Sequence, residues 1–222
     1  GSEMCIRDRV QVINCLKSHV ALDFKRVANA DVEEPELQAP LFSFAAERAE
    51  RGKAVMLITP EYVFKDVTHI TPEFLAEKGI RALVLDIDNT LTADRSQELP
   101  DEVAGWLARM REAGIGLTIV SNGAEKRVRP FAEKLGLAYL YRCAKPLPFA
   151  LGVARRRMQV KRREMAMVGD QLYADRMAAA LYGIPGLMVI PRGPDLGAQV
   201  VLKRKWEKKH WQEYYDRGGK TL

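Results

Sequence analysis

The chain contains few of the residues that mark disulfide-stabilised or zinc-binding proteins. Its three cysteines, Cys5, Cys15 and Cys143, lie far apart, and only three histidines occur among 222 residues. This is too few, at the wrong spacing, for a disulfide framework or a zinc motif. A reducing compartment is therefore expected, and we predict a cytoplasmic location.

Long hydrophobic runs are also missing. No apolar stretch approaches the roughly 20 residues needed to span a bilayer, and the polar start has no apolar segment typical of a secretory signal. A hydrophobic content of 47% still suffices for a globular core. The net charge of +6 favours anionic partners such as phosphorylated metabolites, acidic lipids or nucleic acids.

Residues 1–55 lack the regular patterns of the rest of the chain. The opening letters, GSEMCIRD, resemble a translated sequencing adapter, and residues 10–54 give only faint helical signals. We expect the native protein to begin at Met56, and residues 1–55 to be a non-native leader; a genuine N-terminal extension is the alternative. The remainder is predicted to form a domain over residues 56–195 and a basic, aromatic C-terminal helix over residues 196–222.

From residue 56 onward, predicted strands alternate with predicted helices. Two Thr-Pro-Glu segments, ITPEYVFKDV and ITPEFLAEKG, each predict a short helix, because Thr caps helices well and Pro fits the first turn. Alternation of buried strands with helices predicts a Rossmann-like α/β fold, with a parallel sheet between two helical layers. Strands are predicted at 81–86, 116–121, 138–141, 165–169 and 186–190, and longer helices at 101–113, 124–135, 148–158, 174–182 and about 196–215.

Polar residues follow the predicted strands where each strand ends. Ligands of open α/β sheets bind beyond the carboxyl ends of the strands, so these residues are expected to converge on one edge. Each of them singly has an ordinary structural explanation as a cap, a turn residue or a solvated charge, but their joint occurrence indicates a site. They are Asp86, Asp88 and Thr90, then Ser121 and Asn122, then Lys145, and finally Asp170 and Asp175.

The pair Asp86 and Asp88 points to the chemistry. Residues two apart on a strand face the same side, and two carboxylates this close repel unless a proton or a cation holds them. The set fits phosphoryl transfer, with Asp86 as the nucleophile and Asp88 as the general acid and base. Lys145 and the Ser121 hydroxyl are predicted to stabilise the phosphate oxygens.

Carboxylates around an anionic phosphate require a metal ion, and we predict Mg²⁺. Its predicted ligands are the side chains of Asp86 and Asp170 and the backbone carbonyl of Asp88. Asp175 is expected to orient a metal-bound water. Thr90 and Asn122 complete the predicted substrate contacts, together with Lys145.

The segments DIDNTLT, VSN, AKP and GDQLYAD resemble, in order, the four motifs of haloacid-dehalogenase-like phosphatases. The sequence and motif spacing over residues 56–191 are most similar to the YqeG branch of subfamily IIIA. The resemblance implies a Mg²⁺-dependent phosphatase that works through an aspartyl-phosphate and hydrolyses phosphatidylglycerophosphate to phosphatidylglycerol. Ala174 and Arg176 depart from the branch's pattern beside Asp175.

Short linkers predict that no cap domain covers the site. About ten residues, 91–100, separate the first motif from the next helix, and residues 122–144 are filled by one helix and one strand. Such an open site suits a phosphate that projects from something large, namely a lipid headgroup, a protein or a nucleic-acid end.

Two basic segments bear on the partner. One is RRRMQVKRR at residues 155–163, and the other is the C-terminal helix, where Leu202, Trp206, His210 and Tyr214 are predicted to share a face. Such a helix either lies on an anionic membrane, which would place the protein at the inner face of the membrane, or packs on the sheet. Binding to RNA ranks lower because no RNA-recognition motif accompanies the charge.

Two other functions fit the same residues. One is a phosphatase for a phosphoprotein or a nucleic-acid terminal phosphate, and the other is a non-catalytic module associated with RNA or the ribosome. The retention of Asp86, Asp88, Lys145 and Asp170 argues against the module, because a binding surface gains nothing from acids that repel one another.

Overall fold

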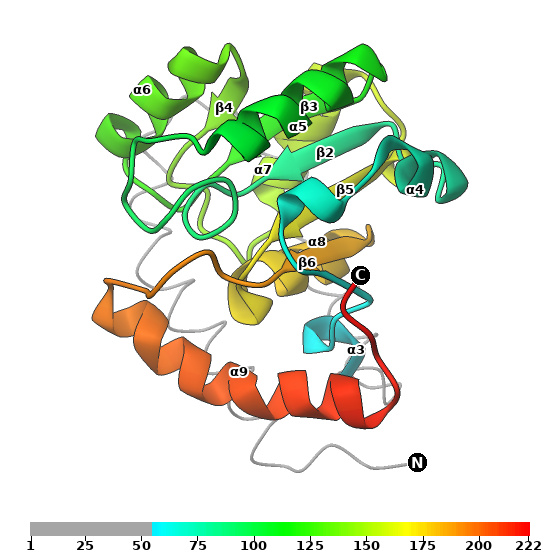
Figure 1. Cartoon of the computed structure of the whole chain (residues 1–222), viewed down its shortest axis with the longest axis vertical. Coiled ribbons are helices and arrows are strands. Elements are labelled where there is room, and N and C mark those ends of the chain that lie inside the picture. The colour runs from blue at the N-terminus through cyan, green and yellow to red at the C-terminus, as the bar shows by residue number, and fades with distance from the viewer. Residues whose placement is uncertain (1–54) are drawn as a thin grey trace, which may run out of the picture. The chain divides into compact units, whose positions relative to one another are not determined.

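Figure 1 shows the chain as a computed structural model, which describes residues 55–222. The predictions made for residues 1–54 lie outside the described residues. The chain divides into two compact units, Gly1–Leu57 and Ile58–Leu222, and the second unit includes residues 58–195 of the predicted domain and the C-terminal helix.

A sheet of six parallel strands forms the centre of Ile58–Leu222, in the order β1-β6-β5-β2-β3-β4. Its central pairs have continuous registers, such as Leu83 opposite Leu117 on one side and opposite Ala166 on the other. The α/β prediction is confirmed. The strands are β1 (Tyr62–Phe64), β2 (Ala82–Leu85), β3 (Gly116–Val120), β4 (Ala138–Leu140), β5 (Met165–Gly169) and β6 (Gly186–Val189).

Helices cover both faces of the sheet (Figure 1). One hydrophobic cluster joins the sheet to α4, α5 and α6, and includes the buried Trp106, whose indole donates to the Ile70 carbonyl at 2.8 Å. The other cluster joins the sheet to α7 and α8. The helices are α3 (Val55–Ile58), η2 (Val67–His69), α4 (Pro72–Glu77), α5 (Asp101–Glu112), α6 (Glu125–Leu135), α7 (Phe149–Met158), η3 (Arg162–Glu164), η4 (Leu172–Arg176), α8 (Met177–Tyr182) and α9 (Ala198–Asp216).

The five predicted strands each agree with an observed strand to within one residue at either end. The edge strand β1 was missed, and the prediction of a helix for ITPEYVFKDV is wrong. Tyr62, Val63 and Phe64 are aromatic or β-branched and favour strands. Pairing with β6 also buries Val63 and Phe64 against the core. The apolar run after Pro60 is too short to sustain a helix, so tertiary pairing decides its structure.

The second Thr-Pro-Glu segment forms the predicted helix. Thr71 caps α4, its hydroxyl accepting from the Phe74 amide at 3.2 Å, and Pro72 occupies the first turn. Good helix formers follow, and Leu75 is buried. The same three letters therefore begin different structures according to the residues after them.

The helix predicted at 174–182 begins with a π-helical turn, η4, before α8. Arg176, which departs from the family pattern, is 2% exposed within this turn. Its guanidinium donates to the Thr59 carbonyl at 2.8 Å and pairs with Glu61 at 3.1 Å. Arg176 therefore ties the turn to the segment that leads into β1.

Within residues 55–222, neither of the two intervals predicted to lack a cap domain contains an inserted domain. Residues 93–100 connect to α5 without a helix or strand, and α6 and β4 fill the interval between Ser121 and Lys145. Among residues 55–222, every helix is too short or too polar to cross a bilayer.

The helix α9 turns a polar side toward the rest of the unit. Glu207 is fully buried, whereas Leu202 is 49% and Trp206 39% exposed. The alternative in which Leu202 and Trp206 pack on the sheet is therefore wrong. Trp206 forms a T-shaped ring pair with Tyr173, with 6.4 Å between the ring centroids.

Leu83 offers a test of the core. It is fully buried in the centre of the sheet, and we expect Leu83→Ala to lower the free energy of unfolding by about 2–5 kcal/mol, because it leaves a cavity. Leu202→Ala is the matched control, with an expected change within about 0.5 kcal/mol because Leu202 is exposed. Urea unfolding followed by circular dichroism measures both. Equal losses in the two variants would contradict the burial of Leu83 and the exposure of Leu202.

Candidate active site

The parallel strands bring the predicted residues to one edge of the sheet. Asp86 follows β2 directly, Ser121 follows β3, and Asp170 follows β5. Lys145 comes from the loop between β4 and α7. All four side chains are buried, with at most 5% of each residue exposed. The carboxyl edge is therefore lined by polar groups removed from bulk water.

Lys145 joins two of the carboxylates. Its ammonium lies 2.8 Å from Asp86 Oδ1 and 2.7 Å from Asp175 Oδ1, and its side chain is 1% exposed. The second Asp175 oxygen accepts from the Gln171 amide at 3.1 Å, which fixes the carboxylate within the π-helical turn. Charge-assisted bonds of this kind compensate for the removal of the charged groups from water.

Asn122 positions Lys145. Its amide oxygen accepts from the Lys145 backbone N–H at 2.7 Å, and its amide nitrogen donates to the Lys145 carbonyl at 3.0 Å. The loop that carries Lys145 is thus fixed to the end of β3. Asn122 was predicted to contact substrate, and that role stays a prediction, since its amide already bonds the backbone of Lys145.

Burial dominates the electrostatics of the edge. It raises the pKa of the Asp86 carboxyl to about 7, against the opposing effect of Lys145. Burial also raises the pKa of Asp170 well above its usual range, although Arg204 opposes this. For Lys145, burial disfavours the charged form, but Asp175 and Asp86 outweigh it, so the pKa of the ammonium is raised.

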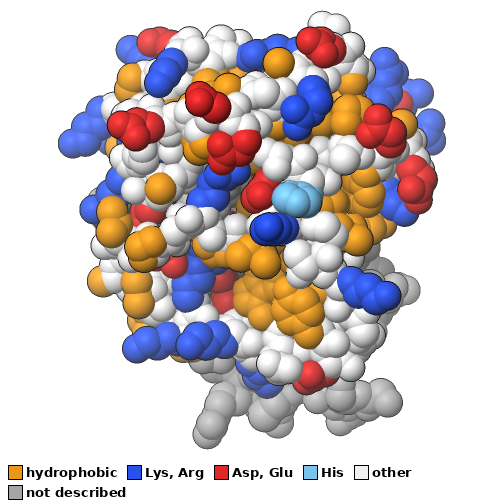
Figure 2. Space-filling model, viewed as in Figure 1, with side chains coloured by type: hydrophobic (Ala, Val, Ile, Leu, Met, Phe, Trp, Pro, Cys, Tyr) orange, Lys and Arg blue, Asp and Glu red, His pale blue; other side chains and the backbone are white. Residues whose placement is uncertain are grey.

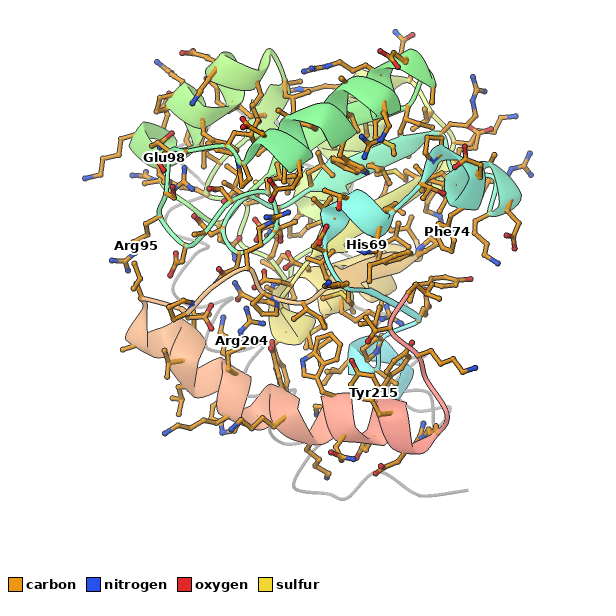
Figure 3. All side chains as sticks on the ribbon, in the orientation of Figure 1. His69, Phe74, Arg95, Glu98, Arg204 and Tyr215 are labelled. Atoms are coloured by element: carbon orange, nitrogen blue, oxygen red, sulfur yellow. The ribbon has the colours of Figure 1, made fainter. Side chains whose placement is uncertain are left out.

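Asp170 is held by a residue from the C-terminal helix. Arg204 of α9 pairs with Asp170 Oδ2 and also donates to the Asp170 backbone carbonyl at 2.7 Å. The other carboxylate oxygen, Oδ1, lies 3.5 Å from the Thr90 hydroxyl, which is buried. Figure 3 shows Arg204 on the side of α9 that faces the sheet. Thr90 was predicted to contact substrate, and this stays a prediction.

Three carboxylates lie close enough to share a metal ion. Asp86, Asp170 and Asp175 each offer an oxygen, and these oxygens lie within 4.8 Å of one another. They outnumber the two cations in contact with them, Lys145 and Arg204, so a divalent cation would offset the remaining repulsion. The residues at this edge therefore fit a divalent metal ion, and the metal-binding roles of Asp86, Asp170 and Asp175 stay predictions.

The fourth, Asp88, has a carboxylate that is not part of this cluster. Asp88 Oδ1 accepts from Arg127 of α6 at 2.7 Å and from the Arg95 amide at 2.9 Å, and its side chain is 26% exposed. Its backbone carbonyl was the predicted metal ligand, and that role stays a prediction. The two acids of the first motif thus have separate surroundings, one buried beside Lys145 and one half-buried beside Arg127.

The Ser121 hydroxyl accepts from the Gly123 amide at 3.1 Å and is buried with the rest of its residue. Since a hydroxyl has one hydrogen and two lone pairs, this contact leaves its hydrogen to donate. The predicted role of Ser121 toward a phosphate oxygen is compatible with this geometry.

Two arginines at this edge were missed from the sequence. Arg127 lies in the helix predicted at 124–135 and Arg204 in the basic C-terminal helix, and neither was predicted to reach the edge of the sheet. Glu207, three residues after Arg204, pairs with it at 3.0 Å, but an acid within a run of lysines does not by itself indicate burial.

The closeness of Gly169 to Asp175 gives a test of this geometry. A Cβ at Gly169 would lie 2.5 Å from the Asp175 Cβ and closer still to its carboxylate, so Gly169→Ala must displace Asp175. We expect a loss of about 1–3 kcal/mol in the free energy of unfolding. Gly105→Ala, in the interior of α5 with only ordinary contacts, is the control and should be neutral or stabilising by up to about 1 kcal/mol. Denaturant titration distinguishes them, and a fully stable Gly169→Ala protein would refute the close approach.

Two comparisons with known proteins identify the family of the chain. A family model described as haloacid dehalogenase-like hydrolase matches residues 93–183. A Bacillus subtilis (strain 168) protein named "Probable phosphatase YqeG" is 35% identical over 151 residues, which cover 68% of this chain and 87% of that protein.

Solved structures resemble the chain more distantly. A 3-deoxy-D-manno-octulosonate 8-phosphate phosphatase from Moraxella catarrhalis is 16% identical, with a TM-score of 0.40 over 65% of this chain and 95% of the other. The hypothetical protein XCC2798 from Xanthomonas campestris is 18% identical, with a TM-score of 0.43 over 54% and 70%. The relationship to the Bacillus protein is close enough to decide the family, and the predicted hydrolase is confirmed: this chain belongs to the haloacid dehalogenase-like hydrolases.

Proposed function

We propose that this hydrolase is a Mg²⁺-dependent phosphatase that cleaves a phosphomonoester through an aspartyl-phosphate on Asp86, with phosphatidylglycerophosphate as its substrate. The observation that carries the proposal is the buried arrangement in which Lys145 bridges Asp86 and Asp175 beside Asp170. Carboxylates this close need a cation to reduce their repulsion. If Asp86 is a nucleophile, the substrate must also offer an electrophilic atom that a carboxylate can attack. A phosphoryl group bound with a divalent ion meets both needs.

Asp86 begins the reaction as the nucleophile. Its oxygen forms a bond to phosphorus while the bond from phosphorus to the alcohol oxygen breaks, which gives an aspartyl-phosphate and an alkoxide. Lys145 favours the ionised, nucleophilic form of Asp86, against the effect of burial. Water then attacks phosphorus, releases inorganic phosphate and restores the Asp86 carboxylate.

Asp88 handles the proton in both steps. As an acid it protonates the leaving alkoxide, and as a base it takes a proton from the attacking water. Its partial exposure gives it access to solvent protons, and the contacts from Arg127 and the Arg95 amide hold the carboxylate in place.

Lys145 and Ser121 stabilise the transferred phosphoryl group, Lys145 by its charge and Ser121 by donating its hydroxyl hydrogen. Asp86, Asp170 and Asp175 would hold the metal ion, with the Asp88 carbonyl. When bound, Mg²⁺ supplies positive charge that offsets the repulsion between the carboxylates and the phosphate.

The substrate assignment rests on the resemblance to the YqeG branch and is supported by the surroundings of the edge. No inserted domain separates the edge from a large substrate within residues 55–222. The helix α9, which reaches the site through Arg204, carries an outer face of apolar and basic residues. We define this outer face by Val201, Leu202, Lys205, Trp206, Lys208 and Lys209, all of which are exposed.

The outer face of α9 suits an anionic lipid surface. Figure 2 shows lysine and arginine side chains beside hydrophobic ones on the lower part of the molecule, where α9 runs in Figure 1. Apolar side chains can enter the headgroup region while the lysines contact lipid phosphates. A cytoplasmic protein attached peripherally to the inner face of the membrane would meet a phospholipid substrate in this way.

The nucleophile is tested by Asp86→Asn, which removes the negative charge at nearly constant shape. We expect the rate of p-nitrophenyl phosphate hydrolysis with Mg²⁺ to fall on the order of 10³-fold or more. The same substitution at Asp101, an exposed residue in the first turn of α5, should leave the rate unchanged. EDTA should abolish activity, and added Mg²⁺ should restore it. Undiminished hydrolysis by Asp86→Asn would refute the mechanism.

The substrate is tested with three phosphomonoesters: p-nitrophenyl phosphate, phosphatidylglycerophosphate in mixed micelles, and an oligonucleotide with a 3′-phosphate. We expect the highest kcat/KM for the lipid. A preference for the oligonucleotide would replace the lipid assignment, and the absence of turnover on all three would favour a binding module.

The outer face is tested by neutralising Lys205 and Lys209 together, as K205Q/K209Q. Each lysine near an anionic surface contributes about 1 kcal/mol, so lipid hydrolysis in anionic micelles should weaken about 10–30-fold. Hydrolysis of soluble p-nitrophenyl phosphate should not change. The control pair K78Q/K134Q removes the same charge at exposed positions, Lys78 at the C-terminal end of α4 and Lys134 in α6. It should leave the hydrolysis of both the lipid and p-nitrophenyl phosphate unchanged. Equal effects of the two pairs would contradict a specific membrane face.

A further inference from the structure

Arg204 connects the C-terminal helix α9 to the carboxyl edge of the sheet. Its guanidinium contacts both the carboxylate Oδ2 and the backbone carbonyl of Asp170, the latter at 2.7 Å. Asp170 is fully buried, and it belongs to the group of carboxylates that fits a metal ion. A single side chain from α9 therefore fixes both the backbone and the side chain of a candidate metal ligand.

The guanidinium is itself held by two other acids. Asp195 accepts from Arg204 Nε at 2.9 Å and from Nη2 at 3.3 Å, and Glu207 accepts from Nη1 at 3.0 Å. Both acids have further donors, since Asn89 donates to Asp195 at 2.9 Å and the Tyr173 amide to Glu207 at 3.2 Å. The position of Arg204 is thus set by contacts that do not involve the Asp170 carboxylate.

We propose that Arg204 is a positioning residue that orients Asp170 for metal binding, and thereby makes α9 part of the metal site. This inference rests on the proposed function, because it concerns the same metal ion. Arg204 occupies Oδ2 of Asp170 and leaves Oδ1, on the side of Thr90, for the ion. Hydrogen-bonded partners of this kind fix the orientation of a ligand and increase metal affinity.

The opposite role would be that of a resident cation that the metal ion must displace. The contacts of Arg204 favour a permanent position instead, because only one of them, that to Asp170 Oδ2, involves a carboxylate of the cluster that fits the ion. Release of the arginine would also leave Glu207, which is fully buried, without its cation. The two roles predict opposite changes in metal affinity when Arg204 is removed.

The far end of α9 is anchored as well. Beyond the helix, the Leu222 amide donates to the Val63 carbonyl at 2.8 Å, and the Leu222 carbonyl accepts from the Lys65 amide at 3.0 Å. These bonds attach the segment to the edge strand β1, where Thr221 pairs with Val63. With both ends attached, α9 can hold Arg204 at a constant distance from the sheet.

The test measures Mg²⁺ binding by isothermal titration calorimetry on the whole protein without substrate. We expect Arg204→Gln to weaken binding about 10–100-fold. Arg204→Lys should fall between, because it keeps the charge but loses the fork that spans two acids and Asp170. Lys134→Gln, at an exposed position of α6, removes the same charge and should bind Mg²⁺ as the wild type does. In the hydrolysis assay, saturating Mg²⁺ should bring the kcat of Arg204→Gln back toward that of the wild type.

Each outcome decides between the roles. Tighter or unchanged Mg²⁺ binding by Arg204→Gln would overturn the proposal, the former in favour of a competing cation. If the wild type binds no Mg²⁺, the proposed cofactor fails first, and the inference with it. Circular dichroism checks folding. Should Arg204→Gln not fold, Asp195→Asn loosens the same guanidinium and leaves the cluster intact; it should weaken binding several-fold, and unchanged affinity would overturn the proposal.

Discussion

The site depends on the ammonium of Lys145 between the carboxylates of Asp86 and Asp175. All three groups are almost fully removed from water, where an unpaired charge would be far more costly than a paired one. Removing the lysine would leave two acids facing each other without a cation. The parallel sheet makes the arrangement possible, because strands β2 and β5 end at the same edge and bring groups distant in sequence into contact.

This edge is completed from the end of the chain. In a doubly wound sheet, the loops after the strands normally supply the ligands, but here a residue of α9 also reaches the centre through Asp170. The loop that leads to α9 is tied to the loop after β2, since the Arg192 amide donates to the Asn89 carbonyl and Asp195 accepts from Asn89. The C-terminal segment thus borders the candidate site.

Local patterns predicted the sheet and the polar residues at its carboxyl edge, because each central strand is a short apolar run followed by a polar residue. They failed where tertiary contacts outweigh local preference. The edge strand β1 looked like a helix start until its pairing with β6 was known. The contacts of Arg127 with Asp88 and of Arg204 with Asp170 join residues 39 and 34 positions apart, and no periodicity in the sequence encodes them. The side of α9 that faces inward was hidden for the same reason, since its buried residues are charged.

The two acids of the first motif show why their surroundings matter more than their spacing. Asp86 is buried and pairs with Lys145 beside other acids. Asp88 pairs with Arg127 instead and remains partly exposed. A nucleophile benefits from a dry, fixed environment, because it must be aligned with one phosphorus atom. An acid and base must exchange protons with solvent between steps, so partial exposure suits it. Two identical side chains can therefore take different roles because the fold gives one of them burial and the other access to water.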